Sequence, residues 1–249
     1  MSAVDPAVLE RDGAFSFELV GGARVLFTAR AHGNLSTQRG EGHERGRATR
    51  EQLCRELGLR WLCASRQVHG SEVQRVRAAK GSGGEAVPID ADGHATALAG
   101  VGAMVLTADC LPVGLAAPAH GGRAVVAMAH AGWRGLAAGV LEQAVLALGE
   151  LGADGPIEAV VGPGAGVCCY EVGEEVHAAF GADAAASEAA GYRRERRIDL
   201  RTIARDRLLA AGVAGVAHAD ACTICDERFF SHRRQRERAG RQAGIAWLG

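Results

Sequence analysis

Aromatic side chains are scarce in this sequence: Phe, Trp and Tyr together make up 4% of its 249 residues. Hydrophobic residues nevertheless reach 48%, so the chain can bury a full core, which must be built mainly from Ala, Val and Leu. Glycine is abundant at 35 residues, and glycine permits tight turns and close contacts between backbones. We therefore expect a core of small side chains and many tight turns.

Two further absences exclude classes of partner. The charge is balanced, with 28 basic and 29 acidic residues, which gives no electrostatic basis for binding nucleic acid or a membrane. No apolar run reaches the roughly 18 residues of a membrane-spanning helix, and the N-terminus lacks the basic start and apolar run of a signal peptide. The seven cysteines are an odd number, so we expect cytoplasmic thiols available for metal binding or catalysis rather than disulfides.

Turn residues and the spacing of apolar residues predict an α/β fold. Gly21-Gly22 separates two apolar segments and predicts a β-hairpin, and Asp199 is suited to cap a helix. We expect strands at 15–20, 24–28, 73–76, 103–108, 112–117, 123–129, 157–161, 216–219 and 243–248, helices at 44–57, 134–151, 173–180 and 199–211, a loose or helical lead-in at 1–12 and a loop at 80–88. Because several strands are joined by hairpins and no linker divides residues 1–249, we expect a single-domain α/β sandwich with mixed sheets flanked by helices.

Three residues able to ligate a metal each follow an apolar run and stand beside glycine or a turn. They are His69 in Gln-Val-His-Gly, Cys110 in Ala-Asp-Cys and His130 in Ala-His-Ala-Gly-Trp-Arg-Gly. Two imidazoles and a thiolate suit zinc, and three protein ligands leave a fourth position for water or substrate. Asp109, next to Cys110, could accept a hydrogen bond from a ligand or carry protons beside the metal. The residue types indicate a catalytic zinc site, although their separation matches no local zinc motif.

The same residues also fit other roles. Cys110 could be a nucleophile with His130 as its base, as in a metal-free cysteine hydrolase, in which His69 has no evident role. A lone cysteine in an apolar run is commonly a small buried hydrophobe, and a lone histidine at a strand end is commonly structural. Cys222-Thr-Ile-Cys225 has Cys-x-x-Cys spacing, but without a second such pair it does not by itself predict a structural zinc site.

Longer motifs occur along most of the chain: Gln-Val-His-Gly, Thr-Ala-Asp-Cys-Leu-Pro-Val, Ala-His-Ala-Gly-Trp-Arg-Gly, Cys-Cys-Tyr-Glu-Val and Phe-Phe-Ser-His-Arg-Arg. From about residue 24 onward the sequence resembles the YfiH or laccase-domain family, also called the multicopper polyphenol oxidase-type family. The resemblance implies an α/β sandwich with a zinc site formed by His69, Cys110 and His130. It also implies purine nucleoside phosphorolysis, in which adenosine, inosine, guanosine or methylthioadenosine reacts with phosphate to give the base and a sugar 1-phosphate.

The resemblance also implies substrate contacts. Arginines in family-like motifs could clamp phosphate through paired N–H groups, although a solvated surface charge is the alternative for each; they are Arg134, Arg233, Arg234 and Arg241. Asn34 and Arg50 resemble family residues that face the nucleoside. The sequence departs from the family at Thr49, where an Asn usually precedes the helix arginine, and in the loop after Arg30, which lacks Gly-Gly-x-Ser and Pro-Tyr elements.

Two further segments have expected structural roles. Asp92 resembles a family aspartate, and we expect it to cap or form a turn. The Gly-rich turn at 162–173 follows a predicted strand, and its backbone N–H groups could line the site. We expect the cysteines within it, Cys168 and Cys169, to pack against the site wall.

Three chemistries remain to be separated. Adenosine deamination is a second activity that the resemblance implies, with a zinc ion and an acid such as Asp109. Copper-dependent phenol oxidation, the older assignment, needs more histidines than this chain offers, because the nine histidines include no His-x-His pair. We therefore expect a zinc-dependent purine nucleoside phosphorylase with small-molecule nucleoside and phosphate as partners, zinc being favoured over copper; the sequence leaves the oligomeric state open.

Overall fold

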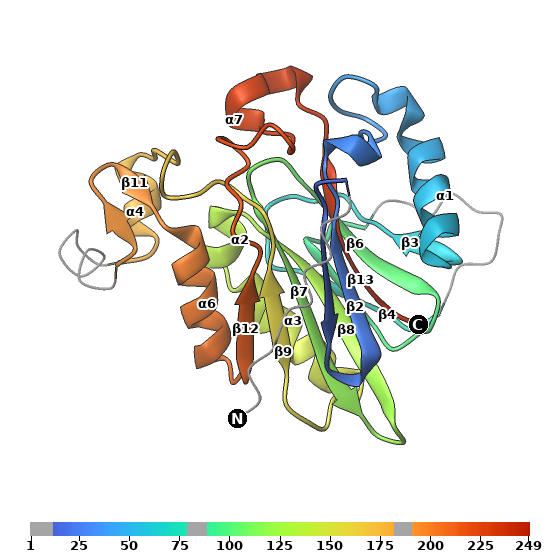
Figure 1. The fold of residues 1–249 in the computed structure, drawn as a ribbon. Coiled ribbons are helices and arrows are strands. Elements are labelled where there is room, and N and C mark those ends of the chain that lie inside the picture. Colours follow the sequence, from blue (N-terminus) through green and yellow to red (C-terminus); the bar gives the residue numbers. More distant parts are fainter. Residues whose placement is uncertain (1–11, 79–88, 182–190) are drawn as a thin grey trace.

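The computed structural model describes residues 12–78, 89–181 and 191–249. Two large sheets dominate it (Figure 1), built from the strands β1 Phe15–Leu19, β2 Ala23–Phe27, β3 Trp61–Cys63, β4 Val73–Val76, β5 Gly93–Thr96, β6 Val101–Thr107, β7 Leu111–Ala119, β8 Arg123–Ala131, β9 Glu158–Val161, β12 Gly215–His218 and β13 Gln242–Leu248. One sheet has the order β1-β2-β13-β6-β3 and the other β12-β9-β7-β8-β5-β4. The pairs β3–β6, β4–β5 and β9–β12 are parallel, and the other neighbours are antiparallel, so both sheets are mixed.

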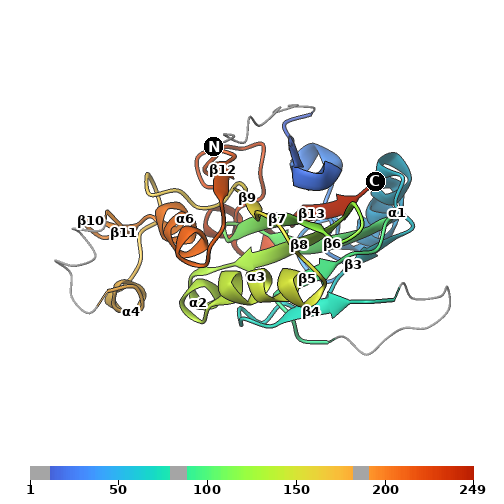
Figure 2. The same cartoon turned by 90° about the horizontal axis from the view of Figure 1, so that it is seen from below.

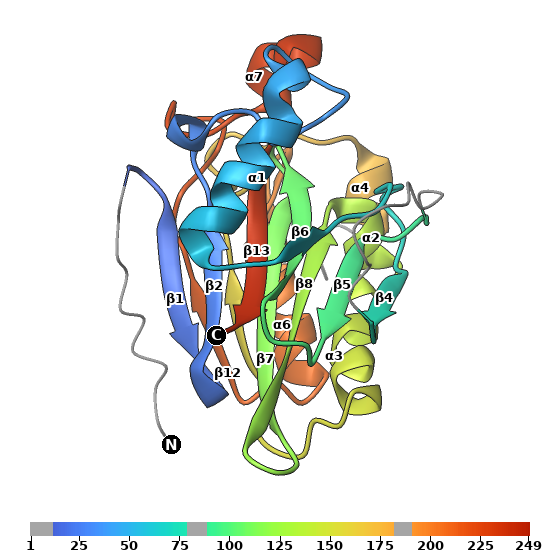
Figure 3. The same cartoon turned by 90° about the vertical axis from the view of Figure 1, so that its right-hand side faces the viewer.

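Helices cover the outer faces of the sandwich. The α-helices are α1 Gly46–Leu57, α2 Trp133–Ala137, α3 Val140–Glu150, α4 Glu174–Ala178, α6 Leu200–Ala210 and α7 His232–Gln235, and the 3-10 helices are η1 Val20–Gly22, η2 Arg30–His32, η3 His43–Arg45 and η4 Arg236–Arg238. Figure 2 shows α3 lying across the six-stranded sheet, with α6 beside it. Figure 3 shows α1 crossing the outer face of the five-stranded sheet. A short hairpin, β10 Arg193–Arg194 and β11 Arg197–Ile198, stands apart from both sheets. Within the described ranges, no helix combines the length and apolar character needed to cross a bilayer.

The space between the two sheets is filled largely by small side chains, as the composition predicts. A Cβ atom on Gly114 in β7 would lie 2.8 Å from Val25 Cγ2, and one on Gly244 in β13 would lie 2.6 Å from Pro112 Cβ. Both distances are too short for a real contact, so these glycines let the two sheets approach each other closely. Since β7 and β8 are buried on both faces, their apolar residues run nearly continuously instead of alternating.

Most of the predicted elements are present within a few residues of their expected bounds. The Gly21-Gly22 hairpin is confirmed, and both glycines have positive φ values, 70° and 72°, which other residues rarely adopt. Asp199 caps α6 by accepting hydrogen bonds from the backbone N–H groups of Arg201 and Thr202. The predicted loop at 80–88 and nearly all of the lead-in at 1–12 lie outside the described residues.

One predicted helix was wrong in its extent, and one strand was not predicted. The expected continuous helix at 134–151 is divided into α2 and α3, because Gly139 has a φ of 90° and caps the start of α3 in the left-handed conformation. The strand β5 was not predicted, since its sequence, Gly-His-Ala-Thr, contains a glycine and a histidine, yet all four residues are buried. Its place between β8 and β4 positions Asp92, which immediately precedes it.

Two glycine substitutions on one helix should have opposite effects on stability. Gly139→Ala is expected to destabilise the fold by about 1–2 kcal/mol, because an L-residue is strained at positive φ. Gly149→Ala, within α3 and with no heavy atom within 4 Å of the added Cβ, should stabilise the fold by about 0.5–1 kcal/mol through helix propensity. Urea unfolding of both variants measures the difference, and equal effects would contradict the helix break at Gly139.

Candidate metal centre and active site

His69, Cys110 and His130 come together from three separate segments. His69 lies in the connection between β3 and β4, Cys110 immediately precedes β7, and His130 lies near the end of β8. Antiparallel pairing of Pro112 with His130 brings Cys110 beside the histidine. The ligand atoms of the three residues lie within 4.8 Å of one another, and the imidazole rings meet edge to face with centroids 4.8 Å apart. The three residues that the sequence indicated as metal ligands therefore form one group.

Asp92 connects two of these three residues. Its fully buried carboxylate accepts a hydrogen bond from His130 Nδ1 at 2.7 Å and from the backbone N–H groups of Val68, His69 and Gly70 at 3.0, 2.9 and 2.7 Å. One side chain thus fixes the turn that carries His69 and the orientation of the His130 ring. Our expectation that Asp92 forms a turn described only part of its role.

The backbone around the centre adopts conformations that are uncommon outside glycine. His69 has a φ of 60° and Asp109, beside Cys110, has a φ of 95°. Such strain persists only where the surroundings impose it, and it is concentrated at functional sites. Gly132 leaves the centre open, because a Cβ there would lie 2.9 Å from Cys110 Sγ and 3.1 Å from His69 Cδ2.

The charges in the group favour a thiolate at Cys110. Burial would raise the pKa of this thiol, but the charge of His130 and the hydrogen bonds from His130 and His69 lower the pKa to about 6. Burial would likewise lower the pKa of His130, whereas Cys110 and Asp92 raise it to about 9. In the metal-free protein these contacts therefore favour the Cys110 thiolate and the His130 imidazolium.

Alkylation of Cys110 in metal-free protein should follow this lowered pKa. The thiolate is the reactive form, so the rate should be high above about pH 6 and fall as the pH drops through that value. Cys54 is an internal reference, because burial and Glu51 raise its pKa above the ordinary value of 9.0. Peptide mapping after iodoacetamide pulses measures both rates, and a midpoint near 9 for Cys110 would contradict its contact with His130.

Asp109 is held by a different part of the chain from the metal-ligand group. Its carboxylate accepts hydrogen bonds from Thr223 Oγ1 at 2.7 Å and from the backbone N–H of Arg233 at 2.6 Å. The second bond satisfies a donor in the first turn of α7, which Ser231 caps. In the described chain, Asp92 rather than Asp109 accepts the hydrogen bond from a histidine of the group. A catalytic role for Asp109 stays a prediction.

The charges of Cys110 and of two predicted arginines, Arg134 and Arg233, all act on Tyr170. Burial and the negative charges of Cys110 and Asp109 raise the pKa of this phenol to about 12, while Arg233 and Arg134 act to lower it. The phenol is therefore uncharged at neutral pH and can donate a hydrogen bond. The charges of four side chains, from three other segments of the chain, therefore act on this phenol.

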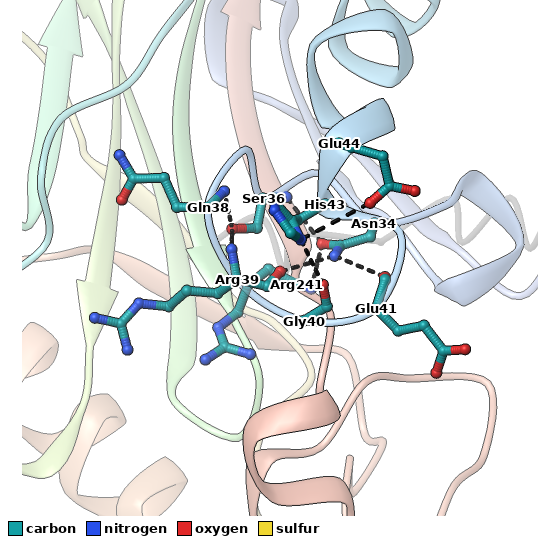
Figure 4. A network of polar contacts seen from close by, with 9 residues as sticks. All are labelled: Asn34, Ser36, Gln38, Arg39, Gly40, Glu41, His43, Glu44 and Arg241. Atoms are coloured by element: carbon teal, nitrogen blue, oxygen red, sulfur yellow. Dashed lines mark hydrogen bonds and ion pairs between the residues drawn. The ribbon is translucent and has the colours of Figure 1, made fainter.

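Arg241 immediately precedes β13 and approaches the same region. Its half-buried guanidinium interacts with the charges of Arg39, Cys110 and Asp109, and its Nη1 donates to the carbonyl oxygens of Ala239 and Gly240. Figure 4 shows the side chains of Arg39 and Arg241 extending in the same direction. Two neighbouring guanidinium groups favour an anion between or beside them, and Arg39 was not predicted from the sequence.

Asn34 and Arg50 shape the loop between β2 and α1. Asn34 Nδ2 donates to the carbonyl oxygens of Arg39 and Glu41, and its Oδ1 accepts from the backbone N–H groups of Ser36 and Arg241 (Figure 4). An amide side chain has two donors and two acceptor positions, so the chain itself occupies all four. Arg50 Nε similarly donates to the Leu35 carbonyl at 2.8 Å. Direct contact of either residue with a nucleoside stays a prediction.

Arg234 is bound mainly by carbonyl groups. Its Nη1 donates to the carbonyl oxygens of Thr223 and Ile224, and its Nη2 donates to that of Phe229. This guanidinium therefore holds the connection between β12 and α7. Arg233 Nη1 also donates to a carbonyl, that of Glu171 at 2.9 Å.

A pocket of about 410 Å³ is lined by Trp133, Tyr170 and Arg233. Arg134 lies over the Trp133 ring at 4.2 Å, and Arg233 lies over the Tyr170 ring at 5.1 Å. The remaining lining includes Glu171, Val172, Gly173, Glu175, Val176 and Arg196. Two aromatic rings beside arginines can accommodate a flat, polar ligand. Residues 170–173 of the Gly-rich turn line this pocket, and a role of the whole turn in the active site stays a prediction.

The family match covers nearly the whole chain. Residues 14–249 match the family model described as "Multi-copper polyphenol oxidoreductase laccase", and the chain belongs to this family. A purine nucleoside phosphorylase of Xylella fastidiosa strain Temecula1 is 44% identical over 227 residues, covering 87% of this chain and 84% of the relative. Purine nucleoside phosphorylase YfiH of Escherichia coli is 40% identical over 193 residues, covering 76% and 73%.

Solved structures share the fold. The Neisseria meningitidis protein NMB0706 superimposes with a TM-score of 0.77 at 33% identity, covering 94% of this chain and 98% of its own. YlmD of Geobacillus stearothermophilus has a TM-score of 0.79 at 29% identity, covering 97% and 98%. The predicted α/β sandwich is therefore confirmed both by the strand order and by these structures.

Proposed function

We propose that this chain catalyses the phosphorolysis of purine nucleosides at the His69–Cys110–His130 group. The observation that carries the proposal is that Arg233, which lies over the Tyr170 ring at 5.1 Å, donates its backbone N–H to Asp109, the neighbour of Cys110. Relatives at 40–44% identity bear the name purine nucleoside phosphorylase, which supports assigning the same reaction class here.

Zinc is the metal that we propose for the centre. His69, Cys110 and His130 would hold it, and their fit rests on three features: the converging ligand atoms, the open space at Gly132 and the Asp92 contact. Because His130 Nδ1 bonds to Asp92, its Nε2 remains available as a ligand, an arrangement common at zinc sites. When bound, zinc supplies a Lewis acid that can polarise a substrate oxygen.

Phosphate would be bound by the arginines in this proposal. Arg233 and Arg241 both lie within electrostatic reach of Asp109 or Tyr170, and guanidinium groups can bind phosphate through two parallel hydrogen bonds. Asp109 positions Arg233 by accepting its backbone N–H. Phosphate held there can be directed at the C1′ atom of the sugar, so that the C1′–O bond forms as the bond to the purine nitrogen breaks.

The nucleoside would occupy the pocket of about 410 Å³. Trp133 and Tyr170 line it, and purines stack favourably on aromatic rings. The uncharged Tyr170 hydroxyl can donate a hydrogen bond to the departing base or the ribose. Stacking has little dependence on the exocyclic groups of the base, which is consistent with a range of purine nucleosides that includes adenosine, inosine, guanosine and methylthioadenosine.

A metal-free cysteine hydrolase is the second candidate, and one observation favours it. Asp92, His130 and Cys110 form a continuous hydrogen-bonded series, which could orient a base toward a nucleophile. That mechanism leaves His69 without a function, although Asp92 also holds the backbone of His69. Asp92 therefore holds both histidines. This is expected if both are metal ligands, so we favour the metal centre.

Product analysis with and without phosphate tests the proposal. Zinc-loaded protein is expected to release free base from inosine and adenosine only when phosphate is present. Equal release without phosphate would indicate hydrolysis and contradict the proposal. Conversion of adenosine to inosine with ammonia would indicate the deaminase activity expected from the family, and its predominance over base release would also contradict phosphorolysis as the main reaction.

A further inference from the structure

Four cysteines outside the proposed active centre converge on one surface of the protein. The Sγ atoms of Cys168, Cys169, Cys222 and Cys225 lie within 4.8 Å of one another. Cys168 Sγ is 3.6 Å from Cys169 Sγ and 3.5 Å from Cys225 Sγ, and Cys169 Sγ is 2.7 Å from Cys225 Sγ. Our expectation that Cys168 and Cys169 only pack against the site wall overlooked this grouping.

The turn at Cys222-x-x-Cys225 is arranged to support a metal ligand. Cys222 Sγ accepts a hydrogen bond from the backbone N–H of Gly166 at 3.2 Å and further backbone hydrogen bonds from Ile224 and Cys225. Three N–H groups directed at one sulfur favour the thiolate, which is the form that binds metals. A disulfide would not require these donors.

We propose that Cys168, Cys169, Cys222 and Cys225 bind a structural zinc ion, separate from the His69–Cys110–His130 group. Four thiolates in tetrahedral geometry are a common closed zinc site, with Zn–S distances of about 2.3 Å and hence S···S distances of about 3.8 Å. Two of the observed sulfur separations, 3.5 and 3.6 Å, are close to this value. The two sequence pairs complete each other: Cys168-Cys169 supplies the second pair that Cys222-x-x-Cys225 lacks in the sequence.

The site would join two loops that support the active centre. The 164–170 turn follows β9 and the 219–225 loop follows β12, and these strands are parallel neighbours. Gly164 and Cys222 form an isolated bridge between the loops, and Thr223, within the Cys-x-x-Cys turn, donates to Asp109 at 2.7 Å. Zinc at the four cysteines would therefore fix Thr223 and, through Asp109, the segment that carries Cys110.

Metal counting in matched variants tests the second site, and this test does not depend on the nucleoside reaction. After purification without chelators, mass spectrometry should give two zinc ions per wild-type chain, one in His69→Ala, one in Cys225→Ser and two in the control Cys54→Ser, which removes a thiol outside both groups. X-ray absorption of His69→Ala should show four sulfur ligands at about 2.3 Å. Zinc bound to nitrogen or oxygen ligands in that variant, or no zinc in it, would overturn the proposal.

Counting free thiols in the wild-type protein tests the proposal without relying on a variant, which could fail to fold. Wild-type protein denatured in chelator without reductant should show all seven cysteines as free thiols, and chelator should lower its melting temperature, as it should for His69→Ala. Five free thiols, with Cys169 joined to Cys225 in the peptide map, would identify a disulfide and overturn the proposal. Iron in place of zinc would overturn the assignment of the metal.

Discussion

Asp92→Asn is expected to reduce zinc affinity at the active centre by about 10–100-fold and to destabilise the fold by about 2–4 kcal/mol. The buried carboxylate accepts four hydrogen bonds, three from the backbone at 68–70 and one from His130. An amide of the same shape places an NH2 group against N–H donors and loses the charge that accepts the hydrogen bond from His130 Nδ1. Both the His69 turn and the His130 ring should therefore lose their fixed orientation.

Asp90→Asn is the matched control for this change. Asp90 lies two residues away, but its carboxylate pairs with Arg66 at the exposed surface. The control should retain zinc content, activity and unfolding midpoint close to those of wild type. Urea unfolding and zinc titration compare the two variants, and an Asp92→Asn protein with wild-type zinc affinity would contradict the role of Asp92 in orienting the ligands.

His69→Ala is expected to abolish zinc binding at the active centre and to lower phosphate-dependent base release by about 100-fold or more, because Lewis-acid stabilisation by a metal contributes several kcal/mol. His69 is exposed, so removing its side chain should change the unfolding midpoint of the metal-free protein little. The variant also separates the two candidate mechanisms, since a Cys110–His130 dyad would retain its activity without this residue.

The backbone at residue 69 requires its own control, because its φ is 60°. His69→Gly suits this conformation and removes the same ligand, so it should lose zinc and activity to the same extent as His69→Ala. His120→Ala removes an exposed histidine that pairs with Asp154 and should retain both. Full activity in either His69 variant would favour the metal-free hydrolase.

The sequence indicated the proposed metal ligands from their chemistry and from family motifs, but it could not indicate what orients them. Asp92 meets His130 because β5 pairs with β8, and it meets the 68–70 backbone because the connection after β3 returns beside β5. The strand β5 is itself inconspicuous, with glycine and histidine among its four residues. Contacts that depend on an unrecognised strand were therefore beyond prediction.

The four-cysteine group was missed for a related reason. Cys168-Cys169 and Cys222-x-x-Cys225 are far apart in the chain, and only the parallel pairing of β9 with β12 brings the loops after these strands together. Asn34 illustrates the opposite case, in which a family motif was easy to recognise but its hydrogen bonds are used within its own loop and with Arg241. Residue type alone does not distinguish a ligand-binding amide from one that shapes a loop.

Transfer of labelled phosphate to the sugar tests the central claim most directly. Zinc-loaded protein incubated with inosine and radiolabelled phosphate should form one labelled sugar 1-phosphate for each hypoxanthine released, and His69→Ala should form almost none. Hypoxanthine released without incorporation of label, or labelled product formed equally well by His69→Ala, would contradict metal-dependent phosphorolysis at the His69–Cys110–His130 group.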